Sequence, residues 1–330
     1  MNNKSYLITG GAGLLGSVIA RRLLAEGHSV RILDNEWRGD ARRIADISDD
    51  TEFIRADIRD SDAVDRAVVG VDGVCHLAYV NGTKFFYSQP DLVLDVAIKG
   101  AMNMIDSCIK HGVRELFLAS SSEVYQSPPH IPTDETAPLV VPDPLNPRYS
   151  YGGGKIINEL MALHCGREHF EKVVIFRPHN VYGPDMGWEH VIPQFVIRMK
   201  RQLEQTGTIP FPIQGDGSET RAFNFIDDFV EGFAVLLDQG EHRGIYHIGT
   251  PEETAIAEVV REIAGYFGRD VEIIPGDLRE GSVTRRCPDI SKLAVLGYSP
   301  RVSLHEGIAL TAKWYDDHAG EAPEGAGEKA

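Results

Sequence analysis

Short apolar runs alternate with longer segments of helical periodicity over the first 180 residues of the chain. The apolar runs predict strands at residues 6–9, 29–33, 52–55, 73–77, 115–119 and 172–176. Strands and helices that alternate in this order form a doubly wound parallel sheet with helices on both faces. We therefore predict an α/β fold in which residues 1–180, with a return segment at about 223–250, build a parallel Rossmann sheet.

The remaining segments predict a second, smaller part of the molecule. Residues 181–222 and 251–317 combine strand-like and helix-like patterns, and we expect them to form a mixed α/β C-terminal lobe. Residues 318–330 are small, charged and rich in glycine and proline. Because such a composition buries little apolar surface, we predict a flexible tail with little packed structure.

Two predicted helices, near residues 91–110 and 151–168, are apolar around most of their circumference. A helix of this kind is buried on nearly all sides. One face of each helix can cover the sheet, and the other face then needs a second partner. We predict a homodimer joined through these two helices, with burial against the chain's own second lobe as the alternative.

A glycine-rich turn joins the first predicted strand to the first predicted helix. Gly10, Gly13 and Gly16 permit a tight turn, close backbone approach to a pyrophosphate and close packing of the helix. The second strand ends at Asp34, where a carboxylate can bind adenosine ribose hydroxyls and repel the extra phosphate of NADP. The predicted cofactor is therefore NAD, although FAD proteins and some methyltransferases have related loops.

Tyr151 and Lys155 are four residues apart, so on a helix they share one face. A cation held beside a tyrosine favours the phenolate, which can then act as a base. Lowering the pKa of a tyrosine by roughly 3 units takes about 4 kcal/mol, so the pair must be partly buried. Without other support, the same spacing would describe two residues on a solvated helix face.

Charge and cysteine usage exclude several classes of protein. The net charge of -16 argues against nucleic acid or an anionic membrane as a partner. The cysteines, Cys75, Cys108, Cys165 and Cys287, lack the paired spacing of a zinc site or redox dithiol, and we predict no metal. The first residues lack a signal peptide's apolar core, and no uncharged stretch is long enough to span a bilayer. We predict a cytoplasmic protein.

Several motifs in sequence order resemble those of the extended short-chain dehydrogenases/reductases, in the NAD-dependent nucleotide-sugar epimerase/dehydratase group. The motifs are the glycine turn at 9–16, the run at 120–125, Tyr151 with Lys155, and the segments 177–184, 215–221, 246–249 and 286–289. They extend over nearly the whole chain. The resemblance implies that the substrate is a nucleotide-diphosphate sugar, bound by the smaller lobe and oxidised with NAD.

The resemblance also implies roles for individual residues. Tyr151 would take the proton from a sugar hydroxyl, while Lys155 would hold the nicotinamide ribose and lower the pKa of the tyrosine. Ser121 would hydrogen-bond the reacting oxygen. The expected substrate-binding residues are Ser121, Ser122, Asn180, Arg221 and Arg286, of which the last three would grip the diphosphate. The expected cofactor-binding residues are Gly10, Gly13, Leu14, Leu15, Gly16, Asp34, Asn35, Asp57, Ile58, Leu77, Ala78, Tyr79, Tyr151, Lys155 and Pro178.

Glu123 decides among the reactions that could follow oxidation at C4 of the sugar. A carboxylate here could remove the acidified C5 proton and expel the C6 hydroxyl, as in 4,6-dehydratases, and UDP-glucuronate decarboxylases carry a similar glutamate. We predict an epimerase, which requires only Tyr151, Ser121, Lys155 and a ketone that can turn over in the pocket. A non-catalytic dinucleotide-binding sensor would typically lack the tyrosine or the lysine, and Asp34 disfavours an NADPH-dependent ketone reductase.

Three consecutive glycines, residues 152–154, separate Tyr151 from Lys155. Within a helix they cost roughly 2 to 3 kcal/mol relative to alanines. Our hypothesis is that the bare backbone makes room for a bulky or extended sugar. The alternative is that the first turn of the helix is simply irregular.

Overall fold

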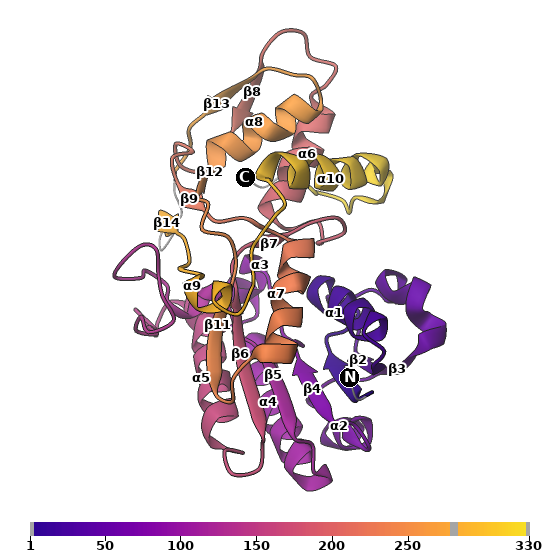
Figure 1. The fold of residues 1–330 in the computed structure, drawn as a ribbon. Coiled ribbons are helices and arrows are strands. Elements are labelled where there is room, and N and C mark those ends of the chain that lie inside the picture. The colour runs from indigo at the N-terminus through magenta and orange to yellow at the C-terminus, as the bar shows by residue number, and fades with distance from the viewer. Residues whose placement is uncertain (1–2, 278–282, 328–330) are drawn as a thin grey trace.

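A seven-stranded sheet forms the lower half of the molecule (Figure 1), with strand order β11-β6-β5-β4-β1-β2-β3. The computed structural model describes residues 3–277 and 283–327. Every pairing within the sheet is parallel. The doubly wound α/β fold is therefore confirmed. The strands are β1 (Ser5–Thr9), β2 (Ser29–Asp34), β3 (Thr51–Arg55), β4 (Gly73–His76), β5 (Glu115–Ala119), β6 (Lys172–Pro178) and β11 (Gly244–Ile248).

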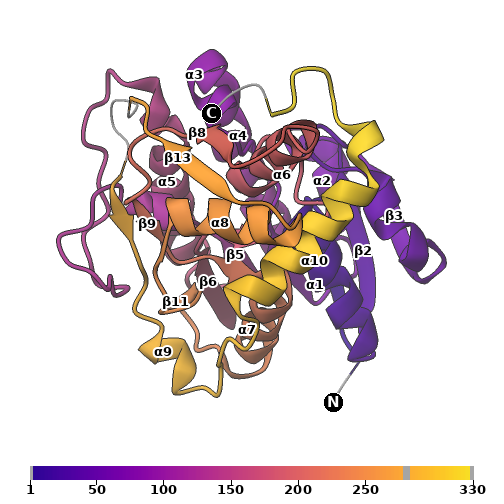
Figure 2. The same cartoon turned by 90° about the horizontal axis from the view of Figure 1, so that it is seen from above.

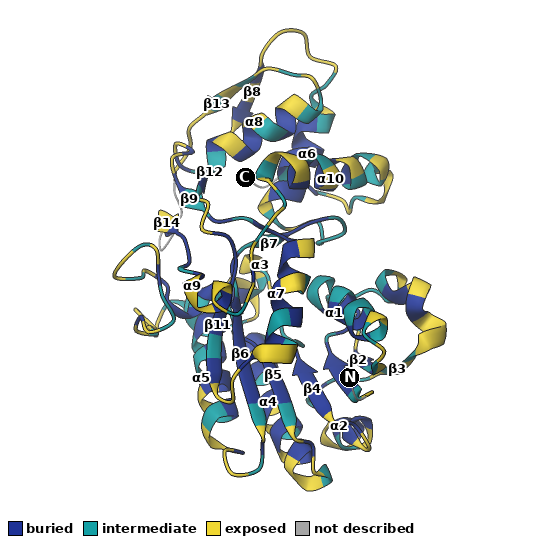
Figure 3. Ribbon diagram, in the orientation of Figure 1, coloured by how far each residue is buried: buried dark blue, intermediate teal, exposed yellow. Residues whose placement is uncertain are grey.

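Neighbouring residues of each strand enter different cores on the two faces of the sheet. Leu7 and Leu33 pack in a cluster with residues of α2 (Ser61–Val68), α4 (Pro90–His111) and α5 (Ser150–His164). Ile8 and Ile32 pack in a second cluster with residues of α1 (Leu14–Ala25) and α7 (Ile226–Gln239). Since side chains alternate along a strand, a strand covered on both faces is apolar throughout. Figure 3 shows most strands of the sheet buried almost along their whole length, whereas the edge strand β3 contains no fully buried residue.

The smaller lobe lies above the carboxyl ends of the strands in Figure 1, and Figure 2 views it from above. Its main helices are α6 (Val191–Arg201), α8 (Ile256–Tyr266) and α10 (Leu304–Asp317). The short strands pair as β8 (Ile209–Pro212) with β13 (Val271–Ile274), β7 (Val181–Tyr182) with β10 (Asn224–Phe225), and β9 (Thr220–Arg221) with both β12 (Thr254–Ala255) and β14 (Arg285–Arg286). Short helices complete the described chain: α3 (Thr83–Ser88), α9 (Ser291–Ala294) and the 3-10 segments Ala41–Asp50, Ser122–Val124, Pro147–Tyr149 and Ala319–Glu321.

The segment after α10 packs more closely than the sequence predicts. Glu321 forms an ion pair with Arg42, at 3.0 Å, and Ala326 is buried. A Cβ on Gly327 would contact Arg198. Residues 320, 321, 323 and 324 are nonetheless exposed, so the flexible tail stays a prediction, and its residues 328–330 lie outside the described residues.

Helices α4 and α5 pack against each other, but each keeps an exposed apolar strip. The chain's own second lobe, the alternative partner for these helices, does not cover this strip. The exposed residues of the strip are Leu94, Met102, Ile109, Ile157 and Leu160. The homodimer that would cover this strip stays a prediction. Among the described helices, none combines the length and the apolar character needed to span a bilayer.

Candidate active site

One cavity of about 820 Å³ opens at the carboxyl ends of the strands, between the sheet and the smaller lobe. Its lining contains Tyr151, Lys155, Ser121 and Glu123. Ligand sites of open parallel sheets lie at this edge. The cavity brings together every residue predicted for the site except Arg221. The other members of that set in its lining are Gly10, Gly13, Leu14, Leu15, Gly16, Asp34, Asn35, Asp57, Ile58, Leu77, Ala78, Tyr79, Ser122, Pro178, Asn180 and Arg286.

The glycine turn has the geometry that a dinucleotide requires. Gly10 has φ +73°, and a Cβ there would lie 2.8 Å from the amide nitrogen of Ala78. A Cβ on Gly16 would overlap the carbonyl of Gly10, so this glycine allows α1 to approach the turn. No side chain caps the N-terminus of α1, and its first amides remain available to an anion. These residues fit NAD, whose pyrophosphate needs such donors.

Asp34 is fixed at the end of β2 by two backbone donors. The amide of Ala12 donates to Oδ2 at 3.0 Å, and the amide of Glu36 donates to Oδ1 at 2.7 Å. Burial raises the pKa of Asp34, although both backbone hydrogen bonds oppose this shift. Each carboxylate oxygen keeps acceptor capacity beyond these bonds. The carboxylate can therefore receive the hydroxyl groups of a ribose in a fixed orientation.

Tyr151 and Lys155 occupy the first turns of α5 and are almost completely buried. The ammonium of Lys155 donates to the carbonyl of Ala119, at the end of β5, over 2.6 Å. Burial lowers the pKa of Lys155 to about 7, and the charge of Glu159 only partly opposes this shift. The same helix face therefore carries both side chains into the cavity, as the spacing of four predicts.

The pKa of Tyr151 differs from the expectation. Burial raises it to about 12, even though a hydrogen bond with Ser121 lowers it. Lys155 does not overcome this effect, because its Nζ lies 5.9 Å from the centroid of the tyrosine ring. Desolvation of the phenolate is thus larger than the influence of the lysine in this arrangement. The expectation that Lys155 lowers the pKa of Tyr151 is wrong for the protein without ligands.

Glu123 forms the centre of a charged cluster in the lining of the same cavity, and its charge contributes to the raised pKa of Tyr151. Its Oε1 accepts from Nη1 of Arg286 at 2.6 Å, and its Oε2 lies 3.8 Å from Nη2 of Arg148. Burial raises the pKa of Glu123, but the charges of Arg286, Arg148 and Arg221 outweigh it and hold the pKa below its usual value. Glu123 is therefore an ionised partner of arginine near neutral pH.

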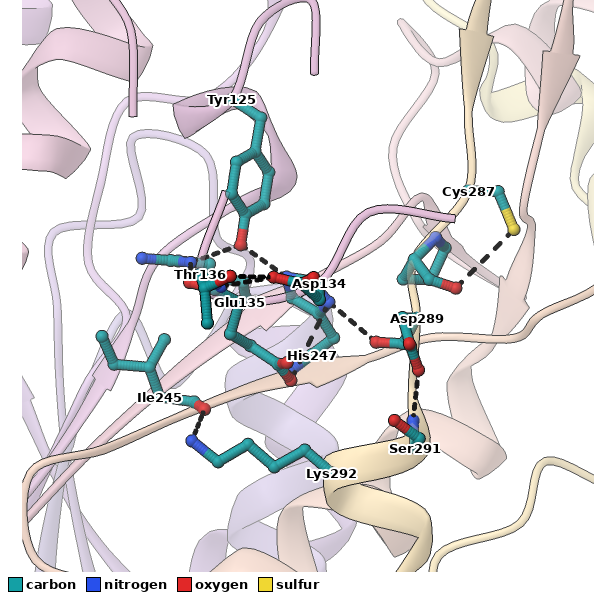
Figure 4. Close-up of polar contacts among 12 residues, drawn as sticks. Tyr125, Asp134, Glu135, Thr136, Ile245, His247, Cys287, Asp289, Ser291 and Lys292 are labelled. Atoms are coloured by element: carbon teal, nitrogen blue, oxygen red, sulfur yellow. Dashed lines mark hydrogen bonds and ion pairs between the residues drawn. The ribbon is translucent and has the colours of Figure 1, made fainter. Parts of the chain in front are cut away.

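Arg286 reaches Glu123 because its segment is docked onto the larger lobe. The amide of Thr133 donates to the carbonyl of Cys287 at 2.9 Å, and the amide of Asp289 donates to the carbonyl of Thr133 at 2.7 Å. Figure 4 shows His247, at the end of β11, directed toward the backbone of Asp289, with 3.0 Å between Nδ1 and the carbonyl oxygen. These contacts join three segments that are far apart in the sequence.

The predicted diphosphate-binding residues have different positions. Asn180, with φ 37°, lines the cavity and donates from Nδ2 to the carbonyl of Ala222 at 3.2 Å. Arg221 is outside the lining and donates to backbone carbonyls, with Val283 at 2.6 Å. Burial lowers the pKa of Arg221 to about 10. Arg286 and Arg221 thus have protein partners, and their binding of a diphosphate stays a prediction.

Two residues that contact this site were missed in the sequence. Arg148 contributes the second cation beside Glu123, and Phe86 stacks on the ring of Tyr151 with centroids 4.7 Å apart. Arg148 lies three residues before Tyr151, and this short spacing is a sequence signal from which its place near the site could have been predicted. Phe86 belongs to a short helix whose approach to α5 no local pattern indicates.

Two of the three glycines between Tyr151 and Lys155 are required by packing against protein atoms. A Cβ on Gly152 would lie 2.8 Å from the carbonyl oxygen of Glu123, and a Cβ on Gly154 would overlap the hydroxyl of Tyr79. At Gly153 a Cβ would make only an ordinary contact with Val141. None of the three lines the cavity. The hypothesis that they make room for a bulky sugar is therefore not supported by this geometry.

The fold and this site together define a class of NAD-dependent enzymes. The model of the family described as "NAD dependent epimerase/dehydratase family" matches residues 6–249. The chain belongs to this family, and the predictions of the family, its fold and its NAD cofactor are confirmed. In the part of the chain that the structure describes, no group of histidine, cysteine, aspartate and glutamate side chains is arranged to hold a metal ion.

Similar proteins in the family catalyse different reactions. UDP-glucuronic acid decarboxylase 2 of Arabidopsis thaliana is 32% identical over 312 residues, which cover 93% of this chain and 67% of the relative. The crystal structure of the UDP-glucose 4-epimerase of Thermus thermophilus with NAD has a TM-score of 0.82 at 30% identity, covering 94% of this chain and 99% of that one. The dTDP-glucose 4,6-dehydratase DesIV of Streptomyces venezuelae, with NAD bound, has a TM-score of 0.83 at 30% identity, covering 96% and 98%. The family assignment therefore leaves the reaction to be argued from the site.

Proposed function

We propose that the protein is a nucleotide-sugar 4-epimerase that oxidises C4 of its substrate and reduces it again from the other face of the sugar. The observation that most supports this proposal is the 2.6 Å ion pair between Glu123 and Arg286. A dehydratase needs a base that removes the C5 proton. A carboxylate whose pKa is held low by arginines is a weak base, so this arrangement favours a reaction confined to C4.

The proposed roles of the residues follow from their positions. In its phenolate form Tyr151 takes the proton of the C4 hydroxyl and returns it, and Ser121 hydrogen-bonds the same oxygen. Lys155 is the cation beside these groups and holds the ribose of the nicotinamide. NAD, when bound, supplies the hydride acceptor and donor. The glycine turn and Asp34 bind the pyrophosphate and the adenosine ribose, and the remaining predicted cofactor residues in the cavity surround them.

The substrate end of the cavity suits an anionic ligand. Arg286, Arg148 and Arg221 carry three positive charges near Glu123, so the cluster keeps a surplus of positive charge. A nucleotide diphosphate satisfies this surplus, and guanidinium groups suit its oxygens. Ser122 and Asn180, which line the same cavity, are the proposed uncharged contacts.

The same surplus of charge favours one second candidate, a uronate decarboxylase. A 4-keto uronate is a β-keto acid and loses carbon dioxide without a base, so a paired Glu123 does not exclude this reaction. The relatives include a protein named as a UDP-glucuronic acid decarboxylase. Guanidinium groups would hold the sugar carboxylate through the oxidation step.

Product masses distinguish these reactions. The purified protein would be incubated with UDP-glucose, UDP-N-acetylglucosamine, UDP-glucuronate, GDP-mannose and dTDP-glucose, each with NAD. We expect one of these sugars to give a product of unchanged mass with inverted C4. Loss of carbon dioxide from UDP-glucuronate would establish the second candidate instead, and loss of water from any of the sugars would contradict the epimerase proposal. Stable NAD binding with no change in any sugar would favour a sensor.

A homodimer through α4 and α5 is part of the proposal. The exposed apolar strip of these helices includes Met102 and Leu160, which are 49% and 52% exposed. A symmetric partner would remove such a strip from water. Light scattering of the purified protein should give twice the monomer mass, and Leu160→Glu should shift the mass toward the monomer.

A further inference from the structure

Tyr79 lies directly against both members of the catalytic pair. The Nζ of Lys155 is 4.0 Å from the centroid of the Tyr79 ring, closer than it is to the ring of Tyr151. The rings of Tyr79 and Tyr151 meet edge to face, with centroids 5.1 Å apart and an interplanar angle of 79°. A cation at this distance from an aromatic face is attracted to it, most strongly where water is excluded. Lys155 is 4% exposed and meets that condition.

Gly154 is the reason that Tyr79 can take this position. A Cβ at residue 154 would overlap the hydroxyl of Tyr79. That hydroxyl donates to the backbone carbonyl of Tyr151 over 3.3 Å, and so bonds to the first turn of α5. Tyr79, in the loop after β4, thus explains why a glycine lies directly before Lys155. Room for a ligand did not explain this glycine.

We propose that Tyr79 is a positioning residue for the catalytic pair, whose ring stabilises the ammonium of Lys155 and whose hydroxyl fixes the backbone of Tyr151. The family resemblance implies only a contact with the cofactor for this residue. Tyr79 thus has a role within the protein itself, in addition to a contact with the cofactor. This role does not depend on the fate of the oxidised sugar.

Apart from the carbonyl of Ala119, which accepts from the ammonium of Lys155 at 2.6 Å, the groups around this lysine leave its stabilisation to the ring. Burial lowers the pKa of Lys155 to about 7, and among the charged groups only Glu159, one turn along α5, opposes that shift. Glu159 is itself engaged by Arg177, whose Nη2 is 2.6 Å from Oε2 of Glu159. The pKa of His76 on β4 is lowered to about 3 by burial and by Lys155, so this side chain is neutral. Tyr151 is also neutral near pH 7, because burial raises its pKa.

The pKa of Lys155 tests the proposal without any substrate. Full-length protein freed of cofactor would be labelled with 13C at the ε carbon of lysine and titrated by NMR, with Lys155→Arg identifying the signal. In Tyr79→Leu the site stays apolar but loses the ring, and we expect the pKa of Lys155 to fall by about 1 unit. Tyr79→Phe keeps the ring and is the matched control, with a pKa close to that of the unaltered protein. An unchanged or raised pKa in Tyr79→Leu would overturn the proposal.

Gly154→Ala supplies a second test that does not depend on the folding of Tyr79→Leu. The added Cβ should displace the Tyr79 ring, and the pKa of Lys155 should fall again. Combining Gly154→Ala with Tyr79→Phe removes the hydroxyl that the Cβ meets. In the double variant the pKa of Lys155 should therefore return most of the way to its value in the unaltered protein. Failure of the second substitution to restore the pKa would mean that the ring does not act on Lys155. Since neither readout uses a sugar, this failure would leave the proposed epimerase reaction untouched.

Discussion

The two ends of the cavity are built in different ways. At the cofactor end, the groups come from the glycine turn, the end of β2 and the first turns of α5, and burial raises the pKa of Tyr151 while it lowers the pKa of Lys155. At the substrate end, Glu123 stays ionised because arginines from distant segments surround it. A site of buried catalytic side chains and a cluster of ionised side chains that binds substrate can therefore share one cavity, because separate elements supply their groups.

Replacing Tyr151 by phenylalanine tests the cofactor end with the largest expected effect. Loss of the phenol removes the proton acceptor, and turnover should fall by about 10³-fold. Binding at the substrate end should hardly change, so isothermal titration with the active nucleotide sugar should give a similar affinity. Tyr149→Phe, two residues earlier and outside the cavity lining, is the control. Equal losses in both variants would mean that α5 is disturbed rather than its chemistry.

The buried ion pair of Arg177 with Glu159 should contribute more to the stability of the fold than to substrate binding. Arg177 and Glu159 are each 1% exposed, with 2.6 Å between Nη2 and Oε2. Arg177→Leu leaves the carboxylate of Glu159 buried without its partner, and urea unfolding should show a loss of about 3 kcal/mol. Glu171→Gln, which removes an exposed ion pair with Arg114, should change stability by at most about 0.5 kcal/mol. Similar values for both would mean that burial does not decide how much an ion pair contributes to the stability of this protein.

Arg286→Gln attacks the substrate end and should have an intermediate effect. The variant leaves Glu123 without its nearest cation, so the surplus of positive charge falls and the pKa of Glu123 rises. We expect KM for the nucleotide sugar to increase about 30-fold, or about 2 kcal/mol, with a smaller change in kcat. The control is Arg285→Gln, because the neighbouring Arg285 points to Glu253 instead. If kcat falls more than KM rises, Arg286 belongs to the chemical step and the two ends are not separate.

The smallest expected effect concerns the glycines of α5. Gly153→Ala should stabilise the protein by up to about 1 kcal/mol, since its Cβ meets only Val141 at 3.5 Å. Gly152→Ala should destabilise it, because the Cβ would approach the backbone of Glu123. Thermal unfolding of the two variants compares them directly. A weaker affinity for the sugar in Gly153→Ala would restore the idea that this backbone makes room for substrate.

The cofactor end could be predicted closely because its groups follow local rules. The turn from Gly10 to Gly16, Asp34 at the end of a strand and the spacing of Tyr151 and Lys155 are all readable within short segments. The strand positions also agree with the prediction to within one or two residues, since strands covered on both faces are continuous apolar runs.

The substrate end could not be predicted in the same way. The pairing of Glu123 with Arg286 depends on contacts of Thr133 and His247 with the segment 285–289, and no local pattern encodes them. The role of Gly154 likewise depends on Tyr79, from the loop that follows β4. Side chains that meet only after the lobes have packed are invisible to periodicity and spacing.

Solvent deuterium at C5 of the product tests the central claim most directly. The reaction would be run in deuterated water with the nucleotide sugar that is converted, and the product examined by proton NMR. A step confined to C4 predicts an inverted C4 with the C5 proton fully retained. Deuterium at C5 would contradict the claim, because it would require removal of that proton or cleavage of the neighbouring bond.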